Sequence, residues 1–344
     1  MQLTKIKQGT LEWEKARATR IGSSEIFDIV RYYATEDELQ NCGINAENFR
    51  AEEPYTTVWA LYHKMLGDGL YKREALAPSF AEYGHAVEPY GIYKLQRGRA
   101  KKIRAGEVYI DERLIASLDS SGTAEEIDLI PFDFGSGNPE IGQTFACEQK
   151  TMRPDKAKNG MPYKYIIQAQ YQIMETKKDF FILQIMILDE DDDFIRGKIC
   201  QMSRKKKFEY LDEHLAVTHY YFQNNVHLSR LIEECIKRFF DDVDNRNEPT
   251  PFIWYDSQKN IIDSIRANSL FNEDATFEYD LSEFEKLKAE EEEATTKRKA
   301  ELQNIIELAK HNNVCKFRSE NGTVGWFIKT GAFRLKYPAE VMRQ

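Results

Sequence analysis

Residues 143–151 read QTFACEQKT, and this stretch decides the fold. Its composition suits a β-strand, in which successive side chains point to opposite faces of a sheet. Glu148 and Lys150 then share one face, while Gln149 between them points to the other. An acid and a base therefore project together from one surface of the predicted sheet.

A second acid lies upstream of this strand, at the end of another predicted strand. The segment EVYIDERLIASLD ends at Asp119, and EEIDLIPFDF and QTFACEQKT follow it, separated by Asp, Ser and Gly turns. We expect an antiparallel meander that brings the Asp119 carboxylate beside Glu148. These two carboxylates and the backbone carbonyl of Gln149 are hard oxygen ligands of the kind that Mg²⁺ or Mn²⁺ prefers.

Such a site suits phosphodiester hydrolysis. A divalent cation polarises the phosphate and lowers the pKa of a water, and Lys150 would position that water or offset charge in the transition state. The pattern E-x-K is weak by itself, because charged proteins contain it by chance. For the tripeptide alone, an exposed ion pair between Glu148 and Lys150, contributing less than about 1 kcal/mol, is the favoured explanation.

The segments around this strand predict helices and further strands. Ser23 or Ser24 is expected to cap a helix that buries Ile26, Ile29 and Val30. The apolar run FFILQIMIL indicates a strand buried on both faces. We therefore predict an α/β fold with a mixed central sheet flanked by helices. Apolar residues recur at helical spacing in four segments, 11–17, 57–66, 78–96 and 163–176.

The C-terminal part of the chain differs in composition. The segment NEPTPF indicates an exit from the core, so we expect a first domain at 1–256 and an extension at 257–344. A charged helix near 282–310 and a hairpin with Asn321-Gly322 at its turn are predicted there. Lys329, Arg334 and Lys336 would allow that hairpin to contact a nucleic acid, but this role is not favoured over a contact with another subunit or a partner protein.

Composition limits the class of protein. Of the 344 residues, 42% are hydrophobic and 31% charged, which predicts a globular chain. No apolar run of bilayer length and no signal peptide are present, so we expect a cytoplasmic location without a membrane partner. Five widely spaced cysteines fit reduced thiols better than a zinc or iron–sulfur site. The net charge of −9 disfavours a broadly basic surface but permits a local DNA groove.

Five segments, taken in order, resemble the YqaJ and phage lambda exonuclease family of viral recombination nucleases, which has a PD-(D/E)XK restriction-endonuclease-like core. Together they span about residues 13 to 250, and their fixed order is more specific than any one of them. The segments are WEKARATRIGSSEI at 13–26, EYGHAVEPY at 82–90, ASLD at 116–119, EQK at 148–150 and YKYIIQAQYQIMET at 163–176.

The resemblance implies roles for individual residues. Asp119 and Glu148 would be metal ligands, Lys150 the catalytic lysine, and Glu88 a supporting acid that orders the metal or its water. Where this chain has Gln149 the family usually has an apolar residue, and the interval from Asp119 to Glu148 is longer than in the lambda enzyme. The residues that would bind phosphate at or near the DNA 5′ end are Arg17, Ser24, Ser117 and Gln168.

The resemblance also implies an activity: Mg²⁺-dependent 5′-to-3′ degradation of one strand of double-stranded DNA, leaving a 3′ overhang. A ring-shaped homotrimer and delivery of the overhang to a single-strand annealing protein would accompany it. Two alternatives remain open on the sequence. The same site would act as an endonuclease in an open cleft, or the chain would be a non-catalytic DNA-end-binding recombination protein that has kept the fold.

Other charged residues near the motifs have simpler explanations. His85 precedes Glu88 by one helical turn and could share a metal with it, although a position merely near the site is favoured. The basic run at 204–207 fits either a contact with the DNA backbone or an exposed strand end. Additional acids are expected on solvated surfaces, namely Glu82, Glu125, Glu126 and Asp128.

Overall fold

The computed structural model describes residues 1–70, 78–97, 100–125, 130–131, 140–158, 160–189, 193–251, 286, 288–300, 304, 316–318, 324–327 and 333–336. The chain forms two compact units, Met1–Phe271 and Asn272–Gln344. Several residues named above lie outside the described residues: Glu126, Asp128, Asn321, Gly322 and Lys329.

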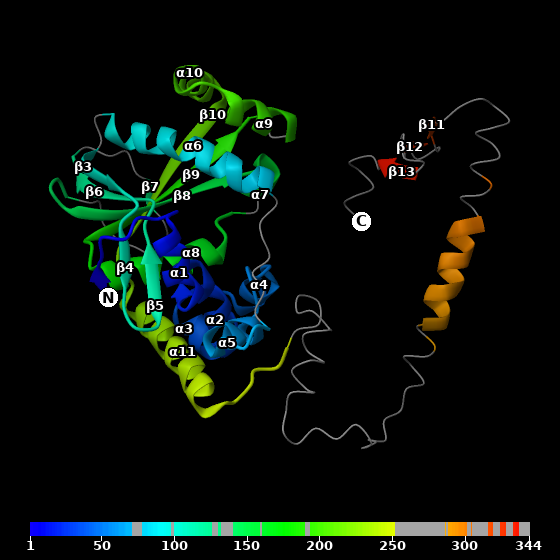
Figure 1. The fold of residues 1–344 in the computed structure, drawn as a ribbon, viewed down its shortest axis with the longest axis horizontal. Coiled ribbons are helices and arrows are strands. Elements are labelled where there is room, and N and C mark those ends of the chain that lie inside the picture. The colour runs from blue at the N-terminus through cyan, green and yellow to red at the C-terminus, as the bar shows by residue number, and fades with distance from the viewer. Residues whose placement is uncertain are drawn as a thin grey trace. The chain divides into compact units, whose positions relative to one another are not determined.

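The first unit is built on a mixed six-stranded sheet in the order β3-β6-β8-β9-β10-β7 (Figure 1). The pairs β8–β9 and β10–β7 are parallel, and the other neighbours are antiparallel. The predicted mixed sheet flanked by helices is thus confirmed. The strands are β3 (Ala100–Ala105), β6 (Ser120–Ala124), β7 (Ile130–Pro131), β8 (Thr144–Met152), β9 (Phe180–Leu188) and β10 (Leu215–Phe222).

Helices cover both faces of this sheet. Helix α6 lies on one face together with α9 and α10, and α8 lies on the other (Figure 1). The FFILQIMIL strand is β9, which sends Leu183 and Ile185 toward α8 but Met186 and Leu188 toward α6. Burial on both sides explains its continuous apolar sequence. The helices of the unit are α1 (Leu11–Ala18), α2 (Ile26–Tyr33), α3 (Glu36–Asn41), α4 (Ala46–Ala51), α5 (Val58–Leu66), α6 (Pro78–Gln96), α7 (Pro154–Ala157), α8 (Tyr163–Thr176), α9 (Asp193–Gln201), α10 (Arg204–His214) and α11 (Val226–Asn245).

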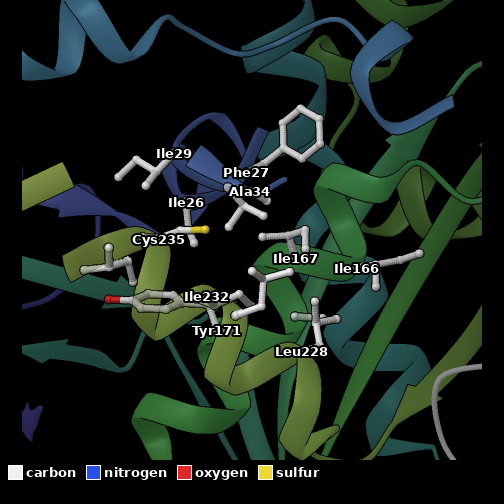
Figure 2. Packing of buried hydrophobic residues seen from close by; sticks show 14 of the residues in the cluster. Ile26, Phe27, Ile29, Ala34, Ile166, Ile167, Tyr171, Leu228, Ile232 and Cys235 are labelled. Carbon is white, nitrogen blue, oxygen red and sulfur yellow. The ribbon is translucent and has the colours of Figure 1, made fainter. Parts of the chain in front are cut away.

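The largest core cluster lies where α2, α8 and α11 meet, as Figure 2 shows. Ile26 and Ile29 from α2 are fully buried against Ile167 of α8 and Ile232 of α11. The predicted burial of the first turns after Ser24 is therefore confirmed. Because α8 is packed between the sheet and these helices, its polar residues are buried as well.

A second, four-stranded sheet corrects the expected meander. It has the order β1-β4-β5-β2. The hairpin β4–β5 belongs to this sheet, whereas β6 starts directly after Asp119 and pairs with β8. Strand β7 pairs in parallel with β10 at the far edge of the larger sheet, so the three segments are not consecutive neighbours. The additional strands are β1 (Gln2–Leu3), β2 (Ile21–Gly22), β4 (Val108–Ile110) and β5 (Leu114–Ser117).

The second unit contains the predicted charged helix and hairpin. Residues 288–300 are helical, and β11 (Lys316–Arg318) pairs antiparallel with β12 (Val324–Phe327). A third strand, β13 (Phe333–Lys336), extends the hairpin on the other side of β12. Elsewhere, the basic run at 204–207 begins helix α10 and is not a strand end. Among the helices that the structure describes, none has the length and apolarity to cross a membrane.

Candidate active site

The three predicted catalytic groups meet at strand β8 of the six-stranded sheet and at the residue that precedes its neighbour β6. Asp119 lies between β5 and β6, and the next residue, Ser120, pairs with Cys147 on β8. The Asp119 carboxylate accepts a hydrogen bond of 2.7 Å from the backbone N–H of Gln149. On the same strand, Lys150 Nζ donates to Glu148 Oε1 at 2.8 Å. The predicted alternation of β8 is therefore present, with Glu148 and Lys150 on one face.

Negative charge accumulates at this point. Burial raises the pKa of Asp119 well above its usual value, and the charges of Glu148 and Glu88 add to the shift, against Lys150 and the Gln149 N–H. Burial also raises the pKa of Glu88, and Glu148 adds to that shift against His85. Helix α6 thus brings Glu88 within electrostatic reach of both β-sheet acids. A bound cation would relieve the mutual repulsion of these carboxylates.

Lys150 is held as a fixed positive charge. Burial acts to lower the pKa of Lys150, but Glu148, Tyr55 and Asp119 act in the opposite direction and leave it raised. Its Nζ also lies 5.4 Å from the centre of the Tyr165 ring, within the range of a cation–π contact. The lysine therefore stays protonated at neutral pH and suits charge stabilisation rather than proton abstraction.

The donor set fits a hard divalent cation. Within the described ranges, no group of three His, Cys, Asp or Glu side chains is placed as a ligand cluster. Asp119 and Glu148 would thus need further oxygen ligands, such as the Gln149 carbonyl and water. Mg²⁺ keeps several waters and is commonly held by only one or two carboxylates, so this incomplete protein shell suits it.

His85 lies on the solvent side of Glu88. Its Nδ1 is 3.7 Å from Glu88 Oε2, and its side chain is 79% exposed. The predicted one-turn spacing is thus present, with His85 as an exposed neighbour of the supporting acid.

Three of the four residues expected to bind phosphate form a cluster beside the carboxylates that is connected through Trp13. Arg17 Nη2 donates to Ser24 Oγ at 3.2 Å, and the guanidinium lies 5.1 Å from the centre of the Trp13 ring. Trp13 Nε1 donates in turn to Ser117 Oγ at 2.8 Å. Ser117 is two residues before Asp119, so the cluster reaches the junction that carries the first acid.

The turn before α2 corrects one sequence expectation. Neither serine caps α2, because Ser23–Glu25 form a 3-10 turn with no side-chain cap. Instead, the Glu25 carboxylate accepts the Gly22 N–H at 2.7 Å and binds Lys64 Nζ at 2.7 and 2.9 Å. This buried ion pair fixes the turn and leaves the serine hydroxyls directed at other groups.

Gln168, the fourth residue assigned to phosphate, lies on α8 and is only 4% exposed. Its Oε1 atom is buried without a hydrogen-bond partner in the described part of the chain. Buried polar atoms are normally paired, so this amide is a reasonable place for a ligand or water.

The sequence did not single out Gln172, which contacts the site more extensively than Gln168. Gln172 Nε2 lies 3.2 Å from Glu148 Oε2, 2.9 Å from the Ser117 carbonyl and 3.2 Å from Ser23 Oγ. The signal that could have found it is helical spacing, because Gln172 follows Gln168 by four residues and shares its face of α8.

Gln149 points to the opposite face of β8 and is 8% exposed. It aligns with Gln184 on β9 and His219 on β10, which makes a buried polar row across three strands. The row lies beneath Gly91 of α6, whose carbonyl accepts from Gln184 Nε2 at 3.2 Å. Both amide atoms of Gln149 and the Gln184 Oε1 atom are nevertheless buried without a hydrogen-bond partner among the described residues.

Comparison with known proteins gives matches to solved structures. An alkaline exonuclease from Laribacter hongkongensis matches with 17% identity and a TM-score of 0.41, over 69% of this chain and 94% of that chain. Its complex with dAMP matches with 16% identity and a TM-score of 0.40, over the same shares. A phage-related exonuclease from Haemophilus somnus 129PT matches with 12% identity and a TM-score of 0.40, over 66% and 96%. No protein-family model and no curated protein sequence matches the chain. At similarities this low, a functional assignment depends on the residues of the site itself.

Proposed function

We propose that the protein is a metal-dependent DNA exonuclease that removes nucleotides from the 5′ end of one strand of a duplex. The observation that carries this proposal is the joint placement of Asp119, Glu148 and Lys150. The first is hydrogen-bonded to the strand that carries the other two, and Glu148 and Lys150 are 2.8 Å apart. Two acids and one fixed cation placed this close together suit a phosphodiester that must be bound, polarised and neutralised.

Each residue has a distinct task in this proposal. Asp119 and Glu148 would hold Mg²⁺, or Mn²⁺, which supplies Lewis-acid polarisation of the phosphate and activation of water. Lys150 offsets negative charge that develops at the phosphate. Glu88 adds an acid whose pKa is raised by burial, so it holds a proton more readily than an exposed glutamate does.

The polarity of the reaction is proposed from the cluster beside the carboxylates. Arg17 offers charged donors and Ser24 a neutral hydroxyl, a combination that recognises a terminal phosphate. Gln168 would contribute through its amide NH₂ group, because phosphate oxygens accept hydrogen bonds and the buried Oε1 can only accept them too. A 5′-phosphate bound there would place the adjoining phosphodiester toward Asp119 and Glu148, so cleavage would leave a 3′ overhang.

The resemblance stated above supports two further expectations, a homotrimer and a single-strand annealing protein as partner. Light scattering of the purified chain measures the first. Co-purification with an annealing protein supplied in the same cell measures the second.

The central experiment uses linear duplex DNA, labelled at either end, and covalently closed duplex DNA. Each substrate is incubated with Mg²⁺ or with EDTA, using the wild type, Glu148→Gln and Lys150→Ala. We expect release of nucleotides from 5′ ends of linear DNA only with Mg²⁺ and only by the wild type.

Three results would contradict the proposal in different ways. Cleavage in EDTA or by both variants would eliminate the site. Digestion of closed circles would indicate an endonuclease on the same fold. Tight binding of DNA ends without turnover would indicate a non-catalytic end-binding protein.

A further inference from the structure

One buried amide connects the two halves of the site. Gln172 Nε2 lies within 3.2 Å of Glu148 Oε2, Ser117 O and Ser23 Oγ, which come from β8, the end of β5 and the turn before α2. The Gln172 side chain is completely buried. A single side chain therefore contacts an acid proposed to bind metal and two segments that carry the proposed phosphate site.

Chemistry fixes the orientation of this amide. A backbone carbonyl and an ionised carboxylate only accept hydrogen bonds, so the NH₂ group must face Ser117 and Glu148. The opposite atom, Gln172 Oε1, is buried with no partner among the described residues. Leaving a buried acceptor unpaired is unfavourable, and the donor contacts on the other side offset that cost.

The contacts lie next to the functional groups on each segment. Ser23 is adjacent to Ser24, which binds Arg17, and Ser117 is two residues before Asp119. The other oxygen of Glu148 is taken by Lys150. Movement of the turn that carries Ser23 and Ser24 would thus be transmitted through Gln172 to the carboxylate of Glu148.

A neighbouring glutamine shows what a purely structural role looks like on the same helix. Gln170 is also buried, and its Nε2 donates to Asn224 Oδ1 at 2.6 Å and Ser229 Oγ at 2.9 Å. Those partners join α8 to the start of α11 and do not touch the acids or Arg17. Gln170 therefore provides a matched control for Gln172.

We propose that Gln172 is a positioning residue that couples recognition of a 5′-phosphate to the placement of Glu148. This inference rests on the proposed exonuclease function and deepens it. A phosphate bound through Ser24 would hold the turn, and the amide would hold Glu148 relative to the turn. Glu148 would thus keep its working position more firmly when the pocket is filled.

The test compares Gln172→Met and Gln170→Met with the wild type on duplexes ending in 5′-phosphate or 5′-hydroxyl. For Gln172→Met we expect the ratio of kcat/KM between the two ends to fall about tenfold, mainly through kcat on the phosphorylated end. Gln170→Met should lower the Tm but keep the ratio. In the absence of DNA, calorimetric titration with Mn²⁺ should show weaker binding for Gln172→Met and unchanged binding for Gln170→Met.

Ser23→Ala extends the test should Gln172→Met not fold. It removes the contact on the phosphate side and keeps the one to Glu148, so the end preference should fall while Mn²⁺ affinity stays at the wild-type value.

The outcomes separate the two proposals. A wild type that digests 5′-phosphorylated ends, with a Gln172→Met variant that keeps its preference and Mn²⁺ affinity, overturns the role of Gln172 alone. A wild type that does not distinguish the two ends also overturns it. A wild type that cleaves no linear duplex overturns the proposed function and this inference with it.

Discussion

The Asp119 carboxylate accepts a 2.7 Å hydrogen bond from the backbone N–H of Gln149. The first acid is thereby attached to the strand that presents Glu148 and Lys150 on either side of that N–H. A change in the register of β8 would displace all three groups together. The placement of Asp119 relative to the other two groups therefore depends on a contact with the backbone of β8.

Asp119→Asn should stabilise the protein at neutral pH and abolish cleavage. Burial, Glu148 and Glu88 raise the pKa of Asp119, so the folded state favours its protonated form. The stabilisation of the folded state by this form is complete below the unfolded pKa of about 3.9 and is lost as the pH rises through the folded pKa. Asparagine keeps an oxygen for the Gln149 N–H without the charge. Calorimetry without metal should show a Tm about 2–4 °C higher at pH 8, and the difference should vanish near pH 4.

Asp179→Asn serves as the control, because the pKa of Asp179 is shifted in the opposite direction to that of Asp119. Hydrogen bonds from the Thr144 backbone and hydroxyl lower the pKa of Asp179, so its contribution is present above the unfolded pKa and is lost as pH falls through the folded pKa. That substitution should not raise the Tm at pH 8. A lower Tm for Asp119→Asn than for the wild type at pH 8 would contradict the charge repulsion inferred for the site.

Lys150→Met should destabilise the protein because it leaves Glu148 and Asp119 without their nearby cation. Because the pKa of Lys150 is raised in the folded state, its charged form stabilises the folded protein fully below the unfolded pKa of about 10.4. This stabilisation is lost only above that pH. The loss of Tm should therefore be constant from pH 6 to pH 9. We expect cleavage to fall about 10²-fold or more, as when other transition-state charge donors are removed.

The double variant Glu148→Gln/Lys150→Met shows whether Lys150→Met loses stability through the broken ion pair or through altered packing. Removing both charges should restore part of the Tm lost in Lys150→Met, because no unpaired acid then remains at position 148. Additive losses in the double variant would show that the 2.8 Å ion pair contributes little to stability.

Local periodicity accounts for what the sequence predicted well. Alternation placed Glu148 and Lys150 on one face of β8, and helical spacing located α6 and α8. Strand partners could not be inferred in the same way, because β7 pairs with β10 and not with its neighbour in sequence. Pairing of this kind depends on contacts far apart in the chain.

The residues missed in the site share that cause. Gln172 becomes part of the site only because α8 packs on the face of β8 that carries Glu148. Lys64 and Glu25 form a buried ion pair across 39 positions of sequence. The Lys64–Glu25 pair has no local pattern, and helical spacing from Gln168 indicates only the face of α8 on which Gln172 lies. A single sequence could therefore indicate the acids but not the contacts that hold them.

Arg17→Lys should weaken recognition of the 5′-phosphate specifically. Lysine keeps the charge but loses the planar fork that contacts Ser24 and lies over Trp13. KM for a 5′-phosphorylated duplex should rise about tenfold, with little change for a 5′-hydroxyl duplex. Arg20→Lys is the matched control, since Arg20 is a nearby arginine bound to the carbonyls of Ala16 and Asp111. Equal effects of both substitutions on both ends would exclude a phosphate pocket at Arg17.

Gly91→Ala should disturb the seat of α6 on the sheet and, through it, Glu88. A Cβ at position 91 would lie 2.1 Å from Gln149 Oε1 and 2.6 Å from Gln184 Oε1, so the buried polar row must move. We expect a loss of about 1–3 kcal/mol in unfolding free energy, typical of overpacking. Cleavage should fall as well, because Gly91 follows Glu88 by one turn of the same helix.

Two further variants test whether the close approach of α6 to Gln149 and Gln184 causes the loss of stability in Gly91→Ala. Gly84→Ala on the same helix meets nothing within 4 Å, so it should raise the Tm through helix propensity. Gly91→Ala/Gln149→Ser shortens the side chain that the new methyl group would strike and should recover much of the lost stability. If the double variant melts below Gly91→Ala alone, Gln149 supports α6 in its own right, and the polar row is needed to hold Glu88 near Asp119.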